Sequence, residues 1–316
     1  MKQADFIYDV IRDCKALSGI KTFENLYELI CSHGKISAAE WTENGEIRSW
    51  SYDEQAQLAD NYAAAISLLT GTSGRVCISL DSCKEWFPLF WGLLRSGHDI
   101  LAVDAMADDR KLSALMHEAG CDILVSATHR NIQCRQIPIS TLIDSPVAEN
   151  YKPVWGHNIA LCTSGTTSDS RIFVYDEATI CEIALFSEGV YNKNHLCIDN
   201  KGYNTLAFLP FHHILGLSAI FIWSSFLGFT LVYIKDRTPK TITETCQRCH
   251  INQIVTIPLL ANNLSKGLVS EVSKKGKLAK VMFSLMEWTS LATQRLFPKA
   301  GLALARNMFS KVRRNL

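Results

Sequence analysis

The stretch RVCISLDSCKEWFPLFWGLLRSGHDILAVDAMADDRKLSALMHEAGCDILVS, residues 75–126, decides the fold. Three apolar runs in it have the length and composition of buried strands: residues 76–80, 100–103 and 123–125. Between them, two segments place apolar side chains at helical spacing, and a glycine follows each: residues 83–96 and 109–119. Strands that alternate with helices predict an α/β fold, with mainly parallel sheets flanked by helices.

The same alternation continues on both sides of this stretch. Upstream, Ser51 and Glu54 have the spacing of a capping box, and an apolar helical face follows them. Downstream, three further strands are expected at residues 158–162, 205–209 and 253–257. After Pro258 the pattern becomes helical, with Pro298 as its expected break, and no linker marks a domain boundary.

The composition bears on several classes of function. The formal charge of the 316 residues is +1, which gives no overall field to attract nucleic acid or an anionic membrane. The N-terminus has acidic residues and no continuous apolar core, so we expect no signal peptide. The 11 cysteines are then expected as free thiols of a cytoplasmic protein.

Two local patterns admit a second interpretation. Cys246, Cys249 and His250 have the C-x-x-C-H spacing of haem attachment, but they also fit one side of a helix. The uncharged run 214–234 is long enough for a membrane span. Its glycine and its β-branched end favour a buried helix followed by a buried strand. We expect no haem, no metal and at most peripheral contact with a membrane.

A hydroxyl-rich loop follows the strand expected at residues 158–162. It reads CTSGTTSDSR, residues 162–171, and its short side chains and glycine allow backbone N–H groups to converge on an anion. Its arginine adds a fixed positive fork that suits phosphate. An ordinary polar surface loop has the same composition, because serine and threonine are common in turns. The candidate phosphate-binding residues are Thr163, Ser164, Gly165, Thr166, Thr167 and Arg171.

A second candidate segment lies downstream and reads LPFHHILGL, residues 209–217. We take His213 and Gly216 as candidates for a substrate-binding site. A packing histidine at the mouth of an apolar helix is the structural alternative for His213. Its neighbour His212 is expected to be structural or partly exposed.

These two segments, in this order, resemble the adenylate-forming (AMP-binding) superfamily, which includes acyl-CoA synthetases, luciferases and peptide-synthetase adenylation domains. The family pattern T-S-G-[ST]-T-G-x-P-K is matched in its first five positions by residues 163–167. Ser168 stands for the following glycine, Ser170 for the proline and Arg171 for the lysine. The family pattern L-P-x-x-H-x-x-G-L is similar to residues 209–217.

The resemblance also covers residues 40–126, which follow the family's opening sheet. The helical, lysine-containing tail after Pro258 is similar to that of long-chain fatty acyl-CoA synthetases. The resemblance therefore implies that residues 1–316 are an incomplete large N-terminal adenylation domain. It implies ATP-dependent activation of a carboxylic acid, here a fatty acid, to an acyl-adenylate and then to acyl-CoA. ATP, Mg²⁺ and coenzyme A are the cofactors and co-substrates that follow from it.

The resemblance carries roles over to matched positions only. Residues 163–167 would bind the phosphates with help from Arg171, and His213 and Gly216 would line the acyl site. No catalytic residue is assigned, because the sequence lacks the family's Y-G-x-T-E segment, its ribose-binding aspartate motif and its C-terminal lid with the catalytic lysine.

We therefore expect part of a larger or split ligase, with a downstream chain that supplies the missing motifs. The alternative is a non-catalytic nucleotide- or acyl-binding remnant, or an interaction module of the same fold. The tail lysines fit a solvated helix face or contact with anionic lipid headgroups.

Overall fold

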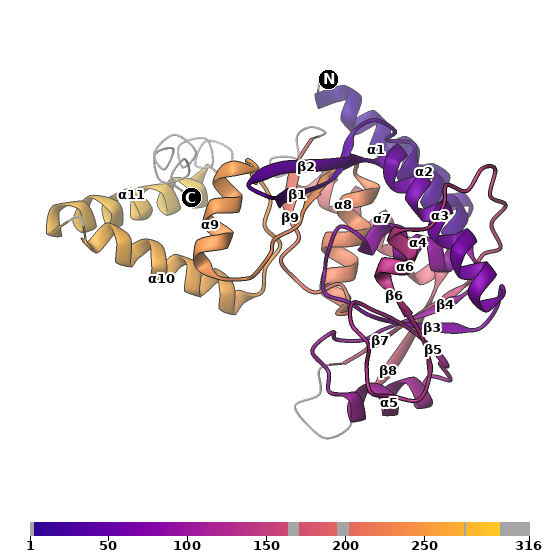
Figure 1. The fold of residues 1–316 in the computed structure, drawn as a ribbon. Coiled ribbons are helices and arrows are strands. Elements are labelled where there is room, and N and C mark those ends of the chain that lie inside the picture. The colour runs from indigo at the N-terminus through magenta and orange to yellow at the C-terminus, as the bar shows by residue number, and fades with distance from the viewer. Residues whose placement is uncertain (1–2, 164–170, 195–201, 275, 298–316) are drawn as a thin grey trace.

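The computed structural model describes residues 3–163, 171–194, 202–274 and 276–297, and its strands form two sheets (Figure 1). The six-stranded sheet has the order β6 (Arg135–Pro138), β5 (Ile123–Ser126), β3 (Arg75–Ser79), β4 (Asp99–Ala102), β7 (Asn158–Cys162) and β8 (Ile172–Asp176). The four-stranded sheet has the order β2 (Glu46–Ser51), β1 (Ser37–Glu43), β10 (Thr230–Val232) and β9 (Asn204–Leu206).

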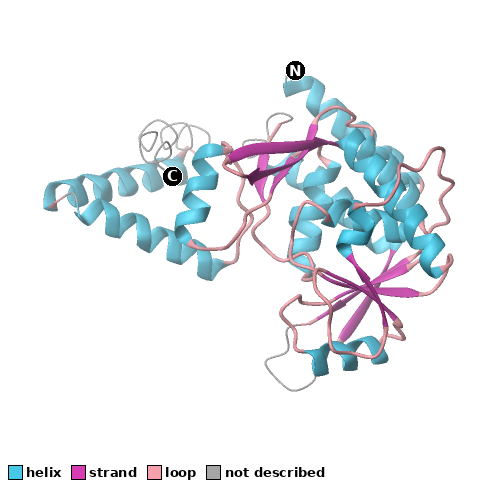
Figure 2. Cartoon of the chain, in the orientation of Figure 1, coloured by secondary structure: helices cyan, strands magenta, loops and turns pink. Residues whose placement is uncertain are grey.

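Helices lie between the two sheets and around them (Figure 2). They are α1 (Gln3–Gly19), α2 (Phe23–Cys31), α3 (Tyr52–Thr70), α4 (Trp86–Arg95), α5 (Asp109–Glu118), α6 (Ile139–Ile143), α7 (Glu177–Asn194), the π-helical η1 (Gly216–Ile222), α8 (Trp223–Phe226), α9 (Pro239–Arg248), α10 (Pro258–Lys274) and α11 (Lys277–Leu296). The α/β class predicted from the alternation of strands and helices is confirmed.

The six-stranded sheet is parallel except at one edge, where β8 runs antiparallel to β7. Successive side chains of a strand point to opposite faces, and here both faces are apolar. In β3, Val76 and Ile78 join the larger core, whereas Cys77 joins a smaller core built with Leu112 and Met116 of α5. This pattern confirms a parallel sheet covered on both faces.

The helix expected after residue 51 begins as its capping box predicts. The Ser51 hydroxyl accepts a hydrogen bond from the Glu54 N–H, and the Glu54 carboxylate accepts one from the Ser51 N–H at 2.7 Å. The next helix, α4, is buried on every side. Its Phe87 packs against Phe221 of η1, with ring centroids 5.9 Å apart. One core therefore spans the helices and both sheets.

The uncharged run 214–234 folds as a buried helical segment followed by a buried strand, as predicted. The segments η1 and α8 lead to β10, where Leu231 and Val232 are almost fully buried. The Tyr52 hydroxyl donates to the Phe229 carbonyl at 2.7 Å and so ties the run to α3. Among the described residues no helix combines the length and apolar character that crossing a bilayer requires.

The C-x-x-C-H residues belong to the end of α9. Ile242 and Cys249 are buried and Cys246 is half-buried, so the predicted helix with one apolar side is confirmed. In the described parts of the chain no three His, Cys, Asp or Glu side chains are grouped as metal ligands.

One predicted strand is wrong. Residues 253–257 form no strand, and only Gln253 makes an isolated bridge, to Thr205. Ile254 and Ile257 are exposed, because this segment leaves the sheet edge and turns into α10 at Pro258. The expected strand at 205–209 is also shorter, since β9 ends at Leu206.

Candidate functional site

The carboxyl ends of four neighbouring parallel strands, β5, β3, β4 and β7, lie at one edge of the six-stranded sheet. In open sheets of this kind, ligands bind beyond that edge, in the loops that leave the strands. The loops here carry Asp81 and Ser82 after β3, Asp104 after β4 and Thr163 after β7. The candidate site lies at this edge.

The base of the hydroxyl-rich loop is closed by two of its predicted phosphate-binding residues. The Thr163 N–H donates to the Arg171 carbonyl at 3.0 Å, and the Arg171 N–H donates to the Thr163 hydroxyl at 3.2 Å. The loop thus connects β7 to the antiparallel β8, and the Arg171 side chain is exposed. The other predicted residues lie outside the described residues: Ser164, Gly165, Thr166 and Thr167.

The second candidate segment is fastened to the same sheet edge. Ser82, just after β3, accepts a hydrogen bond from the Phe211 N–H at 3.1 Å and donates to the Leu209 carbonyl at 3.4 Å. Arg237 donates to the Phe208 carbonyl and to the Asp81 carboxylate, both at 3.0 Å. Two segments of the chain that are far apart in sequence are therefore held at one edge.

The two histidines of this segment differ in environment. His213 is half-buried, and its ring lies 4.2 Å from that of His212, measured between centroids. His212 is 4 % exposed, and neither of its ring nitrogens has a hydrogen-bond partner among the described residues. Of the two alternatives expected for His212, structural or partly exposed, the structure favours the structural one, because the packed segment covers its ring.

The buried His212 faces charged groups of the sheet edge. Its Nε2 lies 3.9 Å from Oδ1 of Asp104, which also accepts a hydrogen bond from the Met106 N–H at 2.9 Å. Burial first, and then the neighbouring His213, lower the pKa of His212 to about 4, although Asp104 acts to raise it. His212 is therefore neutral at physiological pH.

Gly216 has a steric role that the sequence did not reveal. A Cβ atom at this position would lie 2.0 Å from the Pro210 carbonyl oxygen and 2.7 Å from its carbon. The start of η1 can thus pack against residues 209–210 only if position 216 has no side chain. The residue shapes the site by backbone packing.

A mainly apolar pocket of about 500 Å³ opens between α7 and η1. It begins two residues after His213, with Leu215, and continues along the exposed side of η1 into α8. Its lining residues are Glu182, Ile183, Phe186, Leu215, Ser218, Ala219 and Trp223. The pocket has the size and the lining of a site for a small apolar group.

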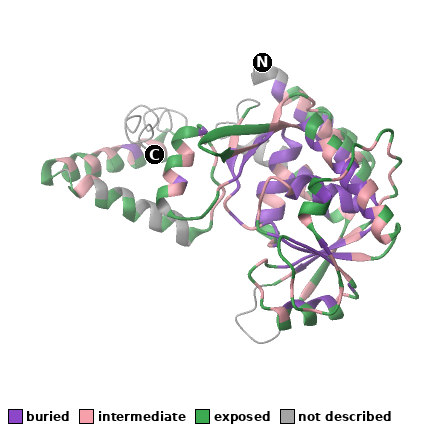
Figure 3. Ribbon diagram, viewed as in Figure 1, coloured by how far each residue is buried: buried purple, intermediate pink, exposed green. Residues whose placement is uncertain are grey.

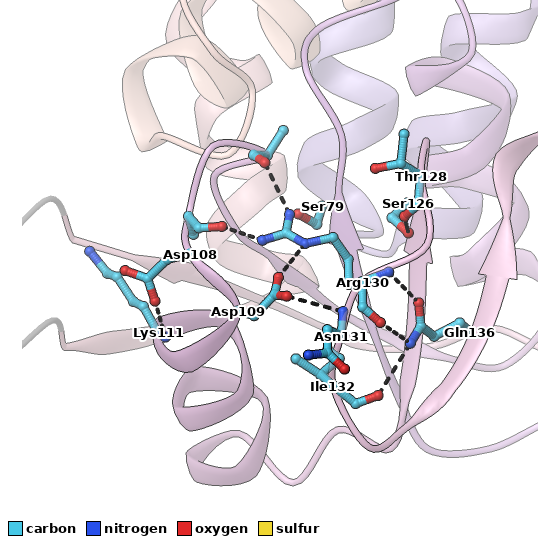
Figure 4. Close-up of polar contacts among 12 residues, drawn as sticks. Ser79, Asp108, Asp109, Lys111, Ser126, Thr128, Arg130, Asn131, Ile132 and Gln136 are labelled. Carbon is cyan, nitrogen blue, oxygen red and sulfur yellow. Dashed lines mark hydrogen bonds and ion pairs between the residues drawn. The ribbon is translucent and has the colours of Figure 1, made fainter.

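A polar cluster around Arg130 holds the loops after β4 and β5 together (Figure 4). Its guanidinium donates to the Asp109 carboxylate at 2.6 Å and to the carbonyls of Ala105, at 3.2 Å, and Ala107. The same carboxylate accepts the Asn131 N–H at 3.0 Å, and the Arg130 hydrogen bond is the main cause that lowers the pKa of Asp109. This cluster fixes the loop that carries Asp104.

Residues that follow β3 and β4 thus lie at one sheet edge together with residues 208–213, and comparison with known proteins shows the family. The model of the AMP-binding enzyme family matches residues 32–305. The chain belongs to the AMP-binding enzyme family. No curated protein sequence gives a significant match.

Several solved structures share this fold. The N-terminal subdomain of Klebsiella oxytoca NpsA, in complex with 3-hydroxybenzoyl-AMSN, has a TM-score of 0.61 at 14 % identity, over 73 % of this chain and 58 % of that chain. The N-terminal domain of FACL13 from Mycobacterium tuberculosis, with a bound inhibitor, has a TM-score of 0.59 at 16 % identity, over 72 % and 61 %.

McyG A-PCP, complexed with phenylalanyl-adenylate, has a TM-score of 0.67 at 15 % identity, over 80 % of this chain and 43 % of that chain. At such identities the likeness shows the fold alone. This chain spans about three fifths of the length of the NpsA and FACL13 structures.

The sequence singled out both segments of the candidate site but not the contacts that hold the second one at the sheet edge. Ser82, Asp104 and Arg237 carry no motif; only the position of Ser82 and Asp104 after strands of the parallel sheet could have suggested them, and Arg237 follows β10 of the other sheet. The sequence left open whether His212 is structural or partly exposed, and its burial decides for the structural role.

Proposed function

We propose that this chain is the nucleotide- and acid-binding part of an ATP-dependent ligase, which converts a carboxylic acid to an acyl-adenylate and then to acyl-CoA. The observation that carries the proposal is that residues 209–217 are fastened by Ser82 to the sheet edge from which the loop 163–171 leaves. Membership of the AMP-binding family supports the adenylation step.

In the first step a carboxylate oxygen of the acid bonds to the α-phosphorus of ATP, the bond from that phosphorus to the bridging oxygen breaks, and pyrophosphate leaves. The carboxylate is already ionised, so no base is needed and the protein positions the reactants and stabilises charge. We assign this task to the N–H groups and hydroxyls of residues 163–167 and to the guanidinium of Arg171, with His213 beside the acid. A thiol, proposed as that of coenzyme A, then displaces AMP.

ATP is used with Mg²⁺ in our proposal. No group of three or more His, Cys, Asp or Glu side chains is present in the described ranges, so the residues seen do not form a metal site of their own. We therefore leave the ion with the phosphates of ATP and assign it no step.

The apolar pocket between α7 and η1 supports our proposal for the substrate class. Leu215, Trp223 and Phe186 line it, and its volume of about 500 Å³ suits an apolar acyl group better than a charged one. We propose a fatty acid. The aryl-acid ligand of NpsA and the phenylalanyl-adenylate of McyG define the competing classes.

We propose that residues 1–316 are one partial large N-terminal domain, because both sheets share a core. A downstream chain would supply the family motifs that this sequence lacks. A cytoplasmic location is also proposed, since the described cysteines are free and at least half-buried. Fractionation of cells that express the tagged chain tests the location.

The deciding experiment is ATP–pyrophosphate exchange with a panel of fatty, aryl and amino acids, with ATP binding measured by calorimetry. Arg171→Ala removes a charged donor and should weaken ATP binding about tenfold or more. The control Arg48→Ala removes another exposed arginine, from β2, and should leave ATP binding unchanged.

Exchange by this chain, or by this chain with a co-expressed downstream segment, supports the ligase. ATP binding without exchange in either case identifies the non-catalytic remnant. No ATP binding, or equal binding by both arginine variants, refutes the proposed site.

A further inference from the structure

Helix α11 exposes large apolar side chains to solvent, and most of its ribbon has the colours of exposed and intermediate residues in Figure 3. They recur three and four residues apart, so they share one side of the helix. We call this surface the α11 face: Leu278, Val281, Met282, Leu285, Trp288 and Leu291, all of them more than half exposed. Ser290, by contrast, is buried and marks the side that faces the protein.

A continuous apolar stripe is different from scattered exposed residues, which are normal on protein surfaces. Trp288 is 69 % and Leu278 is 76 % exposed. The α10–α11 pair projects from the rest of the fold (Figure 1), so no other described element covers this stripe. A stripe of this kind indicates a surface that is covered when the protein works.

Positive charge lies beside the α11 face. Lys280 lines a shallow hollow of about 360 Å³ together with Val281, Ser284, Leu285 and Trp288. Lys277 is exposed one turn before Val281. The face therefore combines an aromatic anchor, aliphatic side chains and flexible lysines whose charged ends reach past the apolar stems.

The charge of the chain is unevenly distributed between its two parts. Residues 258–316 hold eleven lysines and arginines against two glutamates, a formal charge of +9. Residues 1–257 hold 21 basic and 29 acidic residues, a formal charge of −8. The overall charge of +1 thus hides a strongly basic end that carries the exposed apolar stripe.

We propose that the α11 face docks on an anionic lipid bilayer surface and lies in its interface. A helix with apolar and aromatic residues on one side and lysines beside them is the sequence form that binds such interfaces. Anionic lipid would neutralise the positive charge beside the α11 face. A second copy of the chain would instead bring the same positive charge to the contact. Because no described helix is able to span a bilayer, the contact is peripheral. The proposal is independent of the proposed ligase activity.

The test uses flotation of the full chain with two vesicle types, neutral phosphatidylcholine and phosphatidylcholine mixed with phosphatidylserine. The chain should float with the anionic vesicles only, and added salt should release it, because exposed charges are screened. Lys277→Gln and Lys280→Gln should each lower the partition coefficient about fivefold.

A matched pair of double variants separates the face from a general charge effect. Leu285→Glu with Trp288→Glu places two acidic groups on the α11 face and should lower binding about tenfold or more. Leu68→Glu with Met106→Glu adds the same charge at two exposed apolar residues elsewhere, 87 % and 84 % exposed, and should retain most of the binding. Since all four residues are exposed, each variant should unfold like the parent protein.

Three results would overturn the proposal. The chain fails to float with anionic vesicles, it floats equally well with neutral ones, or the two double variants bind alike. Analytical ultracentrifugation provides a further outcome against it: self-association that Leu285→Glu abolishes, without vesicle binding, would assign the α11 face to a second copy of the chain.

Discussion

Acidification should destabilise this fold through one buried side chain, His212. The pKa of a histidine in an unfolded chain is about 6.5, whereas burial and His213 lower that of folded His212 to about 4. Between these values the unfolded chain binds a proton that the folded chain does not. The stability that this neutral imidazole contributes is therefore complete above about pH 6.5 and is lost as the pH falls towards 4.

The magnitude follows from the difference between the two pKa values. Each pKa unit corresponds to about 1.4 kcal/mol, so the free energy of unfolding should fall by about 3 kcal/mol across this window. Asp104 and Asp81 oppose the shift and Arg237 adds to it, so these charges set the folded pKa and hence the pH at which the loss is complete. His213 also faces the ring, at 4.2 Å between centroids.

The assay is urea unfolding at several pH values, with the parent chain and His212→Phe compared at each pH. The variant keeps an aromatic ring and cannot be protonated, so its free energy of unfolding should lose about 3 kcal/mol less between pH 6.5 and 4. His98, whose pKa burial also lowers, remains in both proteins and cancels in the comparison. Parallel pH curves for the two proteins would refute the burial of a neutral His212.

Three further predictions concern residues that position the site. Gly216→Ala should lower the free energy of unfolding, measured with urea, by about 1–3 kcal/mol, because its Cβ would lie 2.0 Å from the Pro210 carbonyl oxygen. An unchanged free energy of unfolding would mean that η1 does not pack against Pro210. Ser82→Ala leaves the Phe211 N–H without its acceptor, so it should lower the free energy of unfolding by about 1–3 kcal/mol and weaken ATP binding. A loss of stability with unchanged ATP binding would mean that the Ser82 hydrogen bonds do not support the nucleotide site. Ser51→Ala removes the cap of α3 and should lower stability by about 1 kcal/mol with ATP binding unchanged, whereas an effect on binding would contradict a purely local role.

Local chemistry explains why much of the fold could be predicted from sequence. The capping box at Ser51, the apolar strands within residues 75–126 and the glycines that end their helices act over a few residues. Such signals need no partner that is distant in sequence. The strand wrongly predicted at residues 253–257 shows the limit, because an apolar run becomes a strand only if a neighbouring strand pairs with it.

The sequence by itself also determined the family, since the loop 163–171 and the segment 209–217 are contiguous patterns. Only the tertiary structure decided that Ser82 fastens the second segment to the sheet edge and that His212 is buried beside Asp104. These contacts join residues that are far apart in the sequence, so they form only when the two sheets pack around one core. A local sequence pattern does not show which distant residues will meet.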